Sequence, residues 1–115
     1  MKVTITTPYV STNALYTINR YNGKRVLTKK ARVHKEAIAW EAKEQIGSSK
    51  PMAGELHVDI HWYMPDQRRR DIDNIKMVID SLTGVLWKDD SNIWTLYMHK
   101  YVDKENPRIE VVVSR

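Results

Sequence analysis

Apolar and polar residues alternate without a break over residues 55–64, the most regular pattern in the chain. The apolar positions run from Leu56 to Met64 at every second residue, so they share one face of an extended strand. The polar positions of the opposite face are His57, Asp59, His61 and Tyr63. We therefore predict a half-buried strand that turns a polar row toward solvent.

A metal site on that row is the competing interpretation, because imidazole and carboxylate groups on one strand face can bind transition metals. Residues two apart on a strand are separated by about 6.8 Å, however, since each residue rises by about 3.4 Å. One ion would strain to reach His57, Asp59 and His61 together. We therefore favour the polar row.

Shorter alternating runs predict further strands at 2–6, 93–101 and 108–113. Two extended runs, 15–21 and 24–27, flank Asn22 and Gly23, a dipeptide typical of a two-residue hairpin turn. The charges at its tip fit both a solvated turn and a basic finger against a phosphate backbone.

A helix is predicted from Thr28, a good N-cap, to Ile46, with Gly47 as its stop. One side of it is apolar, with Ala31, Ile38, Ala42 and Ile46. Val33 and Trp40 lie nearly opposite, so the helix should contact a second partner. Trp40 could lie at a subunit interface or under the hairpin, and we favour the hairpin.

A second, shorter helix is predicted over residues 72–82, where apolar residues recur at spacings of three and four. These residues are Ile72, Ile75, Val78, Ile79 and Leu82. At about 100° per residue, Lys76, Met77 and Asp80 fall within about 60° of Asp73 on the polar side. The helix should end at Gly84.

The predicted order is β, β-hairpin, α, β, α, β, β in a chain of 115 residues. Strands outnumber helices, which indicates an α+β fold: one mixed or antiparallel sheet with two helices packed on it. This length suits one core, so we expect a single domain over residues 1–115. No stretch approaches the roughly 20 apolar residues of a membrane span, and the lack of cysteine fits a cytoplasmic location.

Charge directs attention to residues 66–90. The net charge of +5 favours a polyanionic partner such as nucleic acid. Aspartates are nevertheless concentrated beside three consecutive arginines in this stretch, and Asp89 and Asp90 could fold back to the end of the second helix. Clustered carboxylates repel one another unless a cation lies between them, and such oxygen ligands suit Mg²⁺ or Mn²⁺. The constellation therefore predicts metal-assisted phosphodiester hydrolysis.

Each residue of the stretch also has a purely structural interpretation. Asp71 or Asp73 could cap the helix, Lys76 could pair with Asp80 four residues on, and the arginines could be solvated. For the constellation as a whole we favour the catalytic interpretation, because crowded charges tend to mark functional sites.

The same stretch resembles the RusA-type crossover junction endodeoxyribonucleases, small dimeric, Mg²⁺-dependent enzymes that resolve Holliday junctions. The matching positions are the Arg-Arg-Arg-Asp-Ile-Asp-Asn sequence at 68–74, then Asp80, Leu82, Gly84 and residues 87–90. A weaker likeness near the start involves Pro8, Ser11, Asn13 and Tyr16.

The resemblance implies that Asp71, Asp73 and Asp90 are the catalytic metal ligands, with Mg²⁺ as the ion and Mn²⁺ as a substitute. Three polar residues are expected beside them: Asp89, Asp80 and Asn74. The family usually carries a lysine where this chain has Met77. We expect Lys76, on the same polar face, to take that catalytic role.

The implied substrate is branched DNA, a four-way junction cut by paired symmetric nicks. Candidate DNA contacts are Arg68, Arg69, Arg70, Lys24, Arg25, Lys29 and Lys30. One short chain supplies one acidic cluster, so two cuts imply a homodimer, with Trp40 or Val33 at a candidate interface. The alternative is a basic DNA-binding module without catalysis, in which the acidic residues are structural.

Overall fold

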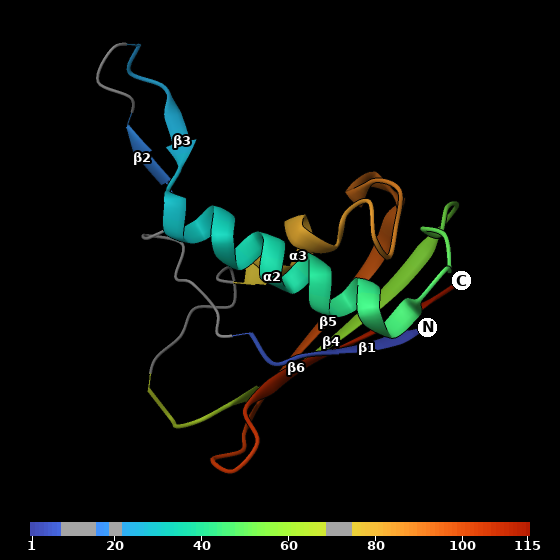
Figure 1. The fold of residues 1–115 in the computed structure, drawn as a ribbon. Coiled ribbons are helices and arrows are strands. Elements are labelled where there is room, and N and C mark those ends of the chain that lie inside the picture. The colour runs from blue at the N-terminus through green and yellow to red at the C-terminus, as the bar shows by residue number, and fades with distance from the viewer. Residues whose placement is uncertain (8–15, 19–21, 69–74) are drawn as a thin grey trace.

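Four strands form the sheet on which the rest of the chain is assembled (Figure 1). The computed structural model describes the chain except for residues 8–15, 19–21 and 69–74. The strands of the sheet are β1 (Lys2–Ile5), β4 (Leu56–Met64), β5 (Ile93–Val102) and β6 (Arg108–Ser114). Their order is β1-β6-β4-β5, with β4 antiparallel to β6 and parallel to β5. The sheet is therefore mixed, which is one of the two arrangements that the sequence predicted.

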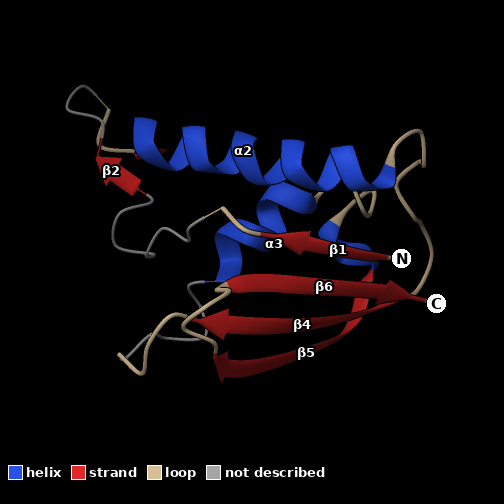
Figure 2. Cartoon of the chain, turned by 60° about the horizontal axis from the view of Figure 1, so that its bottom comes forward, coloured by secondary structure: helices blue, strands red, loops and turns tan. Residues whose placement is uncertain are grey.

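The remaining described elements cover one face of this sheet or extend from it. They are the strands β2 (Tyr16–Ile18) and β3 (Arg25–Leu27), the helices α2 (Lys29–Ile46) and α3 (Lys76–Leu82), and a short 3₁₀ turn, η2 (Asp90–Asn92). Strands β2 and β3 pair antiparallel, which confirms the predicted hairpin. Both helices lie on the same side of the sheet (Figure 2). The predicted α+β class and element order are confirmed.

The predicted alternation in β4 is confirmed by its burial. All five apolar side chains of this strand are at most 8% exposed, whereas the polar row on the other face is exposed or half-buried. The buried row packs against both helices, including Ile38 of α2 and Leu82 of α3. Full burial of one such aliphatic side chain contributes about 1.5–3 kcal/mol, so this layer stabilises the whole arrangement.

Helix α2 begins as predicted, because Thr28 Oγ1 accepts a hydrogen bond from the Ala31 backbone N–H at 3.1 Å. It ends at Gly47, whose φ of 60° is readily reached without a side chain. The expectation that the hairpin covers Trp40 is wrong, since Trp40 is 63% exposed. The hairpin instead extends beyond the first turn of α2 (Figure 1), so Val33 and Trp40 both face outward.

Side chains of α2 also protect one edge of the sheet. The Glu41 carboxylate accepts hydrogen bonds from the backbone N–H groups of Thr6 and Thr7, at 2.9 and 3.2 Å. The Gln45 amide bonds both the N–H and the C=O of Thr4. The outer edge of β1 is therefore hydrogen-bonded to α2, and an edge satisfied in this way is poorly available to another strand.

Helix α3 is buried over a wider arc than its sequence predicted. Met77 was expected on the polar face but is 3% exposed and belongs to the core, and the polar Ser81 is also buried. The physical reason is that α3 lies between α2 and the sheet (Figure 2), so it packs on two sides. Lys76 remains exposed and Asp80 is half-buried. None of the described helices is long and apolar enough to cross a membrane.

Candidate functional site

The first part of the acidic stretch is described only as far as Arg68. Its backbone N–H donates to Asp66 Oδ1 at 2.9 Å, and its Nε lies 3.8 Å from Asp66 Oδ2. The Arg68 side chain is 85% exposed, so it is accessible to a phosphate group. Several predicted site residues lie outside the described residues: Arg69, Arg70, Asp71, Asp73 and Asn74.

Lys76 and Asp80 form the ion pair that the structural interpretation expected. Lys76 Nζ lies 3.3 Å from Asp80 Oδ2, and the pair spans one turn of α3. Exposed pairs of this kind contribute about 0.3–0.5 kcal/mol. So weak a pair orients the Lys76 side chain but leaves its amine able to contact a phosphate group.

The chain folds back after α3, as expected, and a buried tryptophan fixes the return. Trp87 is fully buried, and its Nε1–H donates to Thr83 Oγ1 at 2.9 Å. The backbone N–H of Gly84, at φ 87°, donates to Trp87 C=O at 2.7 Å. Lys88 N–H donates to Met52 C=O at 3.0 Å, which ties the segment to the loop before β4. The acidic pair that follows is thus attached to a rigid support.

The two aspartates of this pair have different environments. Asp89 caps η2: its Oδ1 accepts from Ser91 N–H at 2.9 Å, while its own N–H donates to Asn92 Oδ1 at 3.1 Å. The hydrogen bond from the Ser91 backbone, helped by the Ser91 and Asp90 side chains, lowers the pKa of Asp89. Asp90 is exposed at the first position of η2. One carboxylate oxygen of Asp89 is therefore engaged in capping η2.

Basic residues occur in the hairpin and at the start of α2. Lys29 and Lys30 are exposed in the first turn of α2, and Lys24 is exposed in the hairpin turn. Arg25 lies in β3. Between α2 and α3 there is an open hollow of about 510 Å³, whose lining includes Arg32, Lys35, Glu36, Asp80 and Thr83. The hollow brings two cations of α2 close to the helix that follows the arginines.

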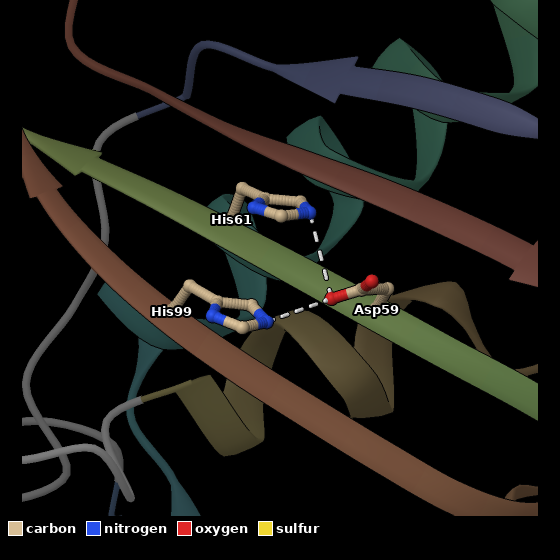
Figure 3. Close-up of side chains that lie close together, drawn as sticks. All are labelled: Asp59, His61 and His99. Carbon is tan, nitrogen blue, oxygen red and sulfur yellow. Dashed lines mark ion pairs between the residues drawn. The ribbon is translucent and has the colours of Figure 1, made fainter.

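A second group of ligand-type side chains lies on the uncovered face of the sheet (Figure 3). Asp59 and His61 extend from β4 and His99 extends from β5. Asp59 Oδ1 lies 3.4 Å from His61 Nε2 and 3.2 Å from His99 Nε2. Among the described residues, this is the group of three whose ligand atoms lie close enough to hold one metal ion, all within 4.8 Å of one another.

The sequence prediction considered a metal at His57, Asp59 and His61 and disfavoured it for reasons of spacing. In the structure the third member of the group is His99 and not His57. The reason is that β4 and β5 are parallel neighbours that place His61 opposite His99. A search for histidines at matching positions of the two alternating runs could have suggested this pair. The register that brings them together, however, was not available from the sequence.

Comparisons with known proteins identify the same family that the acidic stretch resembles. The family model described as Endodeoxyribonuclease RusA matches residues 6–114. The crossover junction endodeoxyribonuclease RusA of Escherichia coli strain K12 is 29% identical over 116 residues, which cover 96% of this chain and 92% of that protein. The protein of the same name from Escherichia coli O6:H1 strain CFT073 gives the same values.

The chain is an α+β domain that carries an acidic, arginine-flanked stretch after a central strand. Together with the family match, these features define a DNA-cleaving hydrolase. The chain belongs to the RusA family of endodeoxyribonucleases. The predicted family and enzyme class are confirmed.

Proposed function

We propose that this chain is a metal-dependent endonuclease that resolves four-way DNA junctions by paired symmetric nicks. The observation that carries the proposal is the family match over residues 6–114, which includes the whole acidic stretch. The relatives bear the name crossover junction endodeoxyribonuclease. A DNA substrate and a net charge of +5 agree with each other. The lack of cysteine fits the proposed cytoplasmic location.

Asp71, Asp73 and Asp90 are the proposed metal ligands. The described member of this set fits the role, because Asp90 is exposed, carries a carboxylate and follows a segment anchored by buried Trp87. Hard carboxylate oxygens favour Mg²⁺, with Mn²⁺ as a substitute. A metal ion held there would supply an activated water and neutralise charge on the scissile phosphate. Asp89, Asp80 and Asn74 would orient the site without binding the ion.

The cationic residues have separate proposed roles. Arg68, Arg69 and Arg70 grip phosphates beside the cut, where the planar guanidinium group can donate two parallel hydrogen bonds. Lys76 stabilises negative charge as the phosphodiester bond breaks. The burial of Met77 supports this assignment, since Lys76 is the exposed one of the two neighbouring positions. Contacts farther along the DNA are assigned to Lys24, Arg25, Lys29 and Lys30.

Two symmetric cuts require two copies of the site, so we propose a homodimer. Apolar side chains are exposed on two candidate surfaces: Val33 and Trp40 on α2, and Trp94 and Leu96 on β5. Trp40→Lys and Trp94→Lys, each measured by light scattering, would show which surface is the interface. The wild type should have twice the monomer mass of 13.5 kDa. A monomer that stays monomeric on a junction would contradict paired cutting.

Cleavage of a synthetic four-way junction, with and without Mg²⁺, tests the proposed function. A linear duplex of the same arm sequence is the matched control substrate. We expect cuts in two strands of the junction in Mg²⁺, none in EDTA, and far slower cutting of the duplex. Tight junction binding without cleavage under any metal would instead support the non-catalytic DNA-binding module.

A further inference from the structure

The geometry points to a second metal site, built by Asp59, His61 and His99 on the uncovered face of the sheet (Figure 3). We propose that it binds a divalent transition metal ion such as Zn²⁺ and thereby links β4 to β5. None of its three residues belongs to the acidic stretch. The inference therefore stands independently of the proposed nuclease activity.

The spacing of the ligand atoms supports this site. A tetrahedral ion with metal–ligand bonds of about 2.0–2.1 Å holds its ligand atoms about 3.3 Å apart. The distances from Asp59 Oδ1 to His61 Nε2 and His99 Nε2 are 3.4 and 3.2 Å, which match two edges of such a tetrahedron. The two imidazole rings are 10° from parallel, with centroids 4.9 Å apart. Rotation of the 46%-exposed His99 side chain would let both ring nitrogens converge on one ion.

The state of Asp59 Oδ1 is a second, independent observation. This oxygen is shielded from solvent, yet it accepts no hydrogen bond from any of the described residues. A shielded carboxylate oxygen that accepts no hydrogen bond costs free energy, and a bound cation would offset that cost. The Asp59 side chain as a whole is 44% exposed, so an ion could reach the group from solvent.

A neighbouring tyrosine favours the ring form of His61 that binds metal. His61 Nδ1 lies 3.1 Å from Tyr101 Oη, which can accept the Nδ1 proton. Nε2 then keeps its lone pair and faces Asp59. Histidine ligands of metal ions usually donate their other N–H to an oxygen in this way. Tyr101 is thus a positioning residue for the site.

The ligand types decide which ion is bound. Two imidazoles and one carboxylate suit Zn²⁺, Ni²⁺ or Cu²⁺ far better than Mg²⁺, which prefers an all-oxygen set and retains its water. Three protein ligands leave a fourth position for water. The two proposed metal sites of this chain therefore differ in the ion they select as well as in their place in the fold.

Zinc binding to the DNA-free protein, measured by calorimetry and by competition with a chromophoric indicator, tests the inference. The variants are His99→Ala, Tyr101→Phe and the control His57→Ala, which removes an exposed imidazole from the same face of β4 but not from the group. Wild type and His57→Ala should bind one equivalent tightly, and His99→Ala should lose that site. Tyr101→Phe should weaken binding by about 10-fold.

Cobalt supplies a spectroscopic readout of the same site. Co²⁺ in a tetrahedral nitrogen and oxygen environment absorbs visible light strongly, and Zn²⁺ should displace this signal in the wild type and in Asp90→Asn. Equal zinc affinity in wild type and His99→Ala, or loss of the site in His57→Ala, would overturn the proposal. So would the absence of a bound equivalent in the wild type.

Discussion

The acidic stretch and the Asp59–His61–His99 group are both sets of ligand-type side chains, but they are assembled in opposite ways. The acidic stretch is contiguous in the sequence, within residues 66–90, and its described part contains α3 and the turn that leads to η2. The histidine group comes from two strands joined through α3, and it forms because β4 and β5 pair in parallel. A contiguous site leaves a motif in the sequence, whereas a site formed across strands depends on register.

The two regions also differ in their chemistry. Carboxylates with arginines at their side suit a hard ion and a phosphate substrate. Two imidazoles with one carboxylate suit a transition metal and offer no cationic group for DNA. We therefore expect substitutions in the acidic stretch to leave zinc binding intact. Substitutions in the histidine group should leave junction cleavage intact.

The largest effect is expected from Asp73→Asn. Asparagine can cap a helix as well as aspartate does, so the fold should persist while the metal loses a charged ligand. Junction cleavage should fall by orders of magnitude, while junction binding and zinc binding at the histidine group stay near wild type. Cleavage rates and gel-shift affinities of the same preparation are the measurements. Normal cleavage would remove Asp73 from the catalytic site.

The next effect concerns the lysine that the chain carries at position 76 instead of 77. Lys76→Ala should slow cleavage without a change in fold. Met77→Lys places an amine at a site that is 3% exposed, so it should lower the free energy of unfolding by roughly 3 kcal/mol or more. Denaturant unfolding measures the loss. If Lys76→Ala with Met77→Lys restored both cleavage and stability, Met77 would have to lie on the polar face.

A smaller, specific effect is expected when Arg69 and Arg70 are both replaced by alanine. Each phosphate contact contributes about 0.9 to the slope of log affinity against log salt, so the slope should flatten by about 2. Junction affinity should fall, whereas zinc affinity should not change. Binding titrations at several salt concentrations provide the test. An unchanged slope would place these arginines away from the DNA.

The smallest effect is expected at Glu41, which belongs to neither region. Partial burial raises the pKa of Glu41, but hydrogen bonds from Thr6 and Thr7 outweigh it and lower the pKa below 4.5. Its contribution is thus present above that value and is lost as the pH falls through the folded-state pKa. Glu41→Gln should cost about 1–2 kcal/mol near neutral pH and less in acid.

Unfolding of wild type and Glu41→Gln at several pH values checks this expectation. Lys43→Gln, in the exposed part of the same helix, is the matched control and should behave as wild type. A Glu41→Gln effect that is equally large in strong acid would mean that the carboxylate charge plays no part in holding β1 to α2.

Much of the fold was predictable because burial follows local periodicity. The alternation from Leu56 to Met64 identified the central strand, and Thr28 and Gly47 bounded the long helix. The predicted polar face of α3 was partly wrong, because Met77 is buried. Helix α3 packs on two sides, and a helical wheel of one helix contains no information about the second. His99 was missed for a related reason: its position beside His61 is set by sheet order, which is a property of the whole chain.

The acidic stretch stays a prediction at the level of individual ligands, since Asp71 and Asp73 lie outside the described residues. What the structure adds is the difference between Asp89 and Asp90: both are exposed, but Asp89 caps η2 and Asp90 is the first residue of that turn. Adjacent aspartates look equivalent in sequence, and the turn that follows them makes them distinct.

The most direct test of the account is the rate of junction cleavage in Mg²⁺, with a zinc chelator present, for wild type, Asp90→Asn and His99→Ala. The acidic stretch is claimed to hold the catalytic ion and the histidine group a separate one. Wild type and His99→Ala should therefore cut the four-way junction at similar rates, while Asp90→Asn should bind the junction and leave it uncut. Cutting by Asp90→Asn at the wild-type rate would contradict the catalytic assignment.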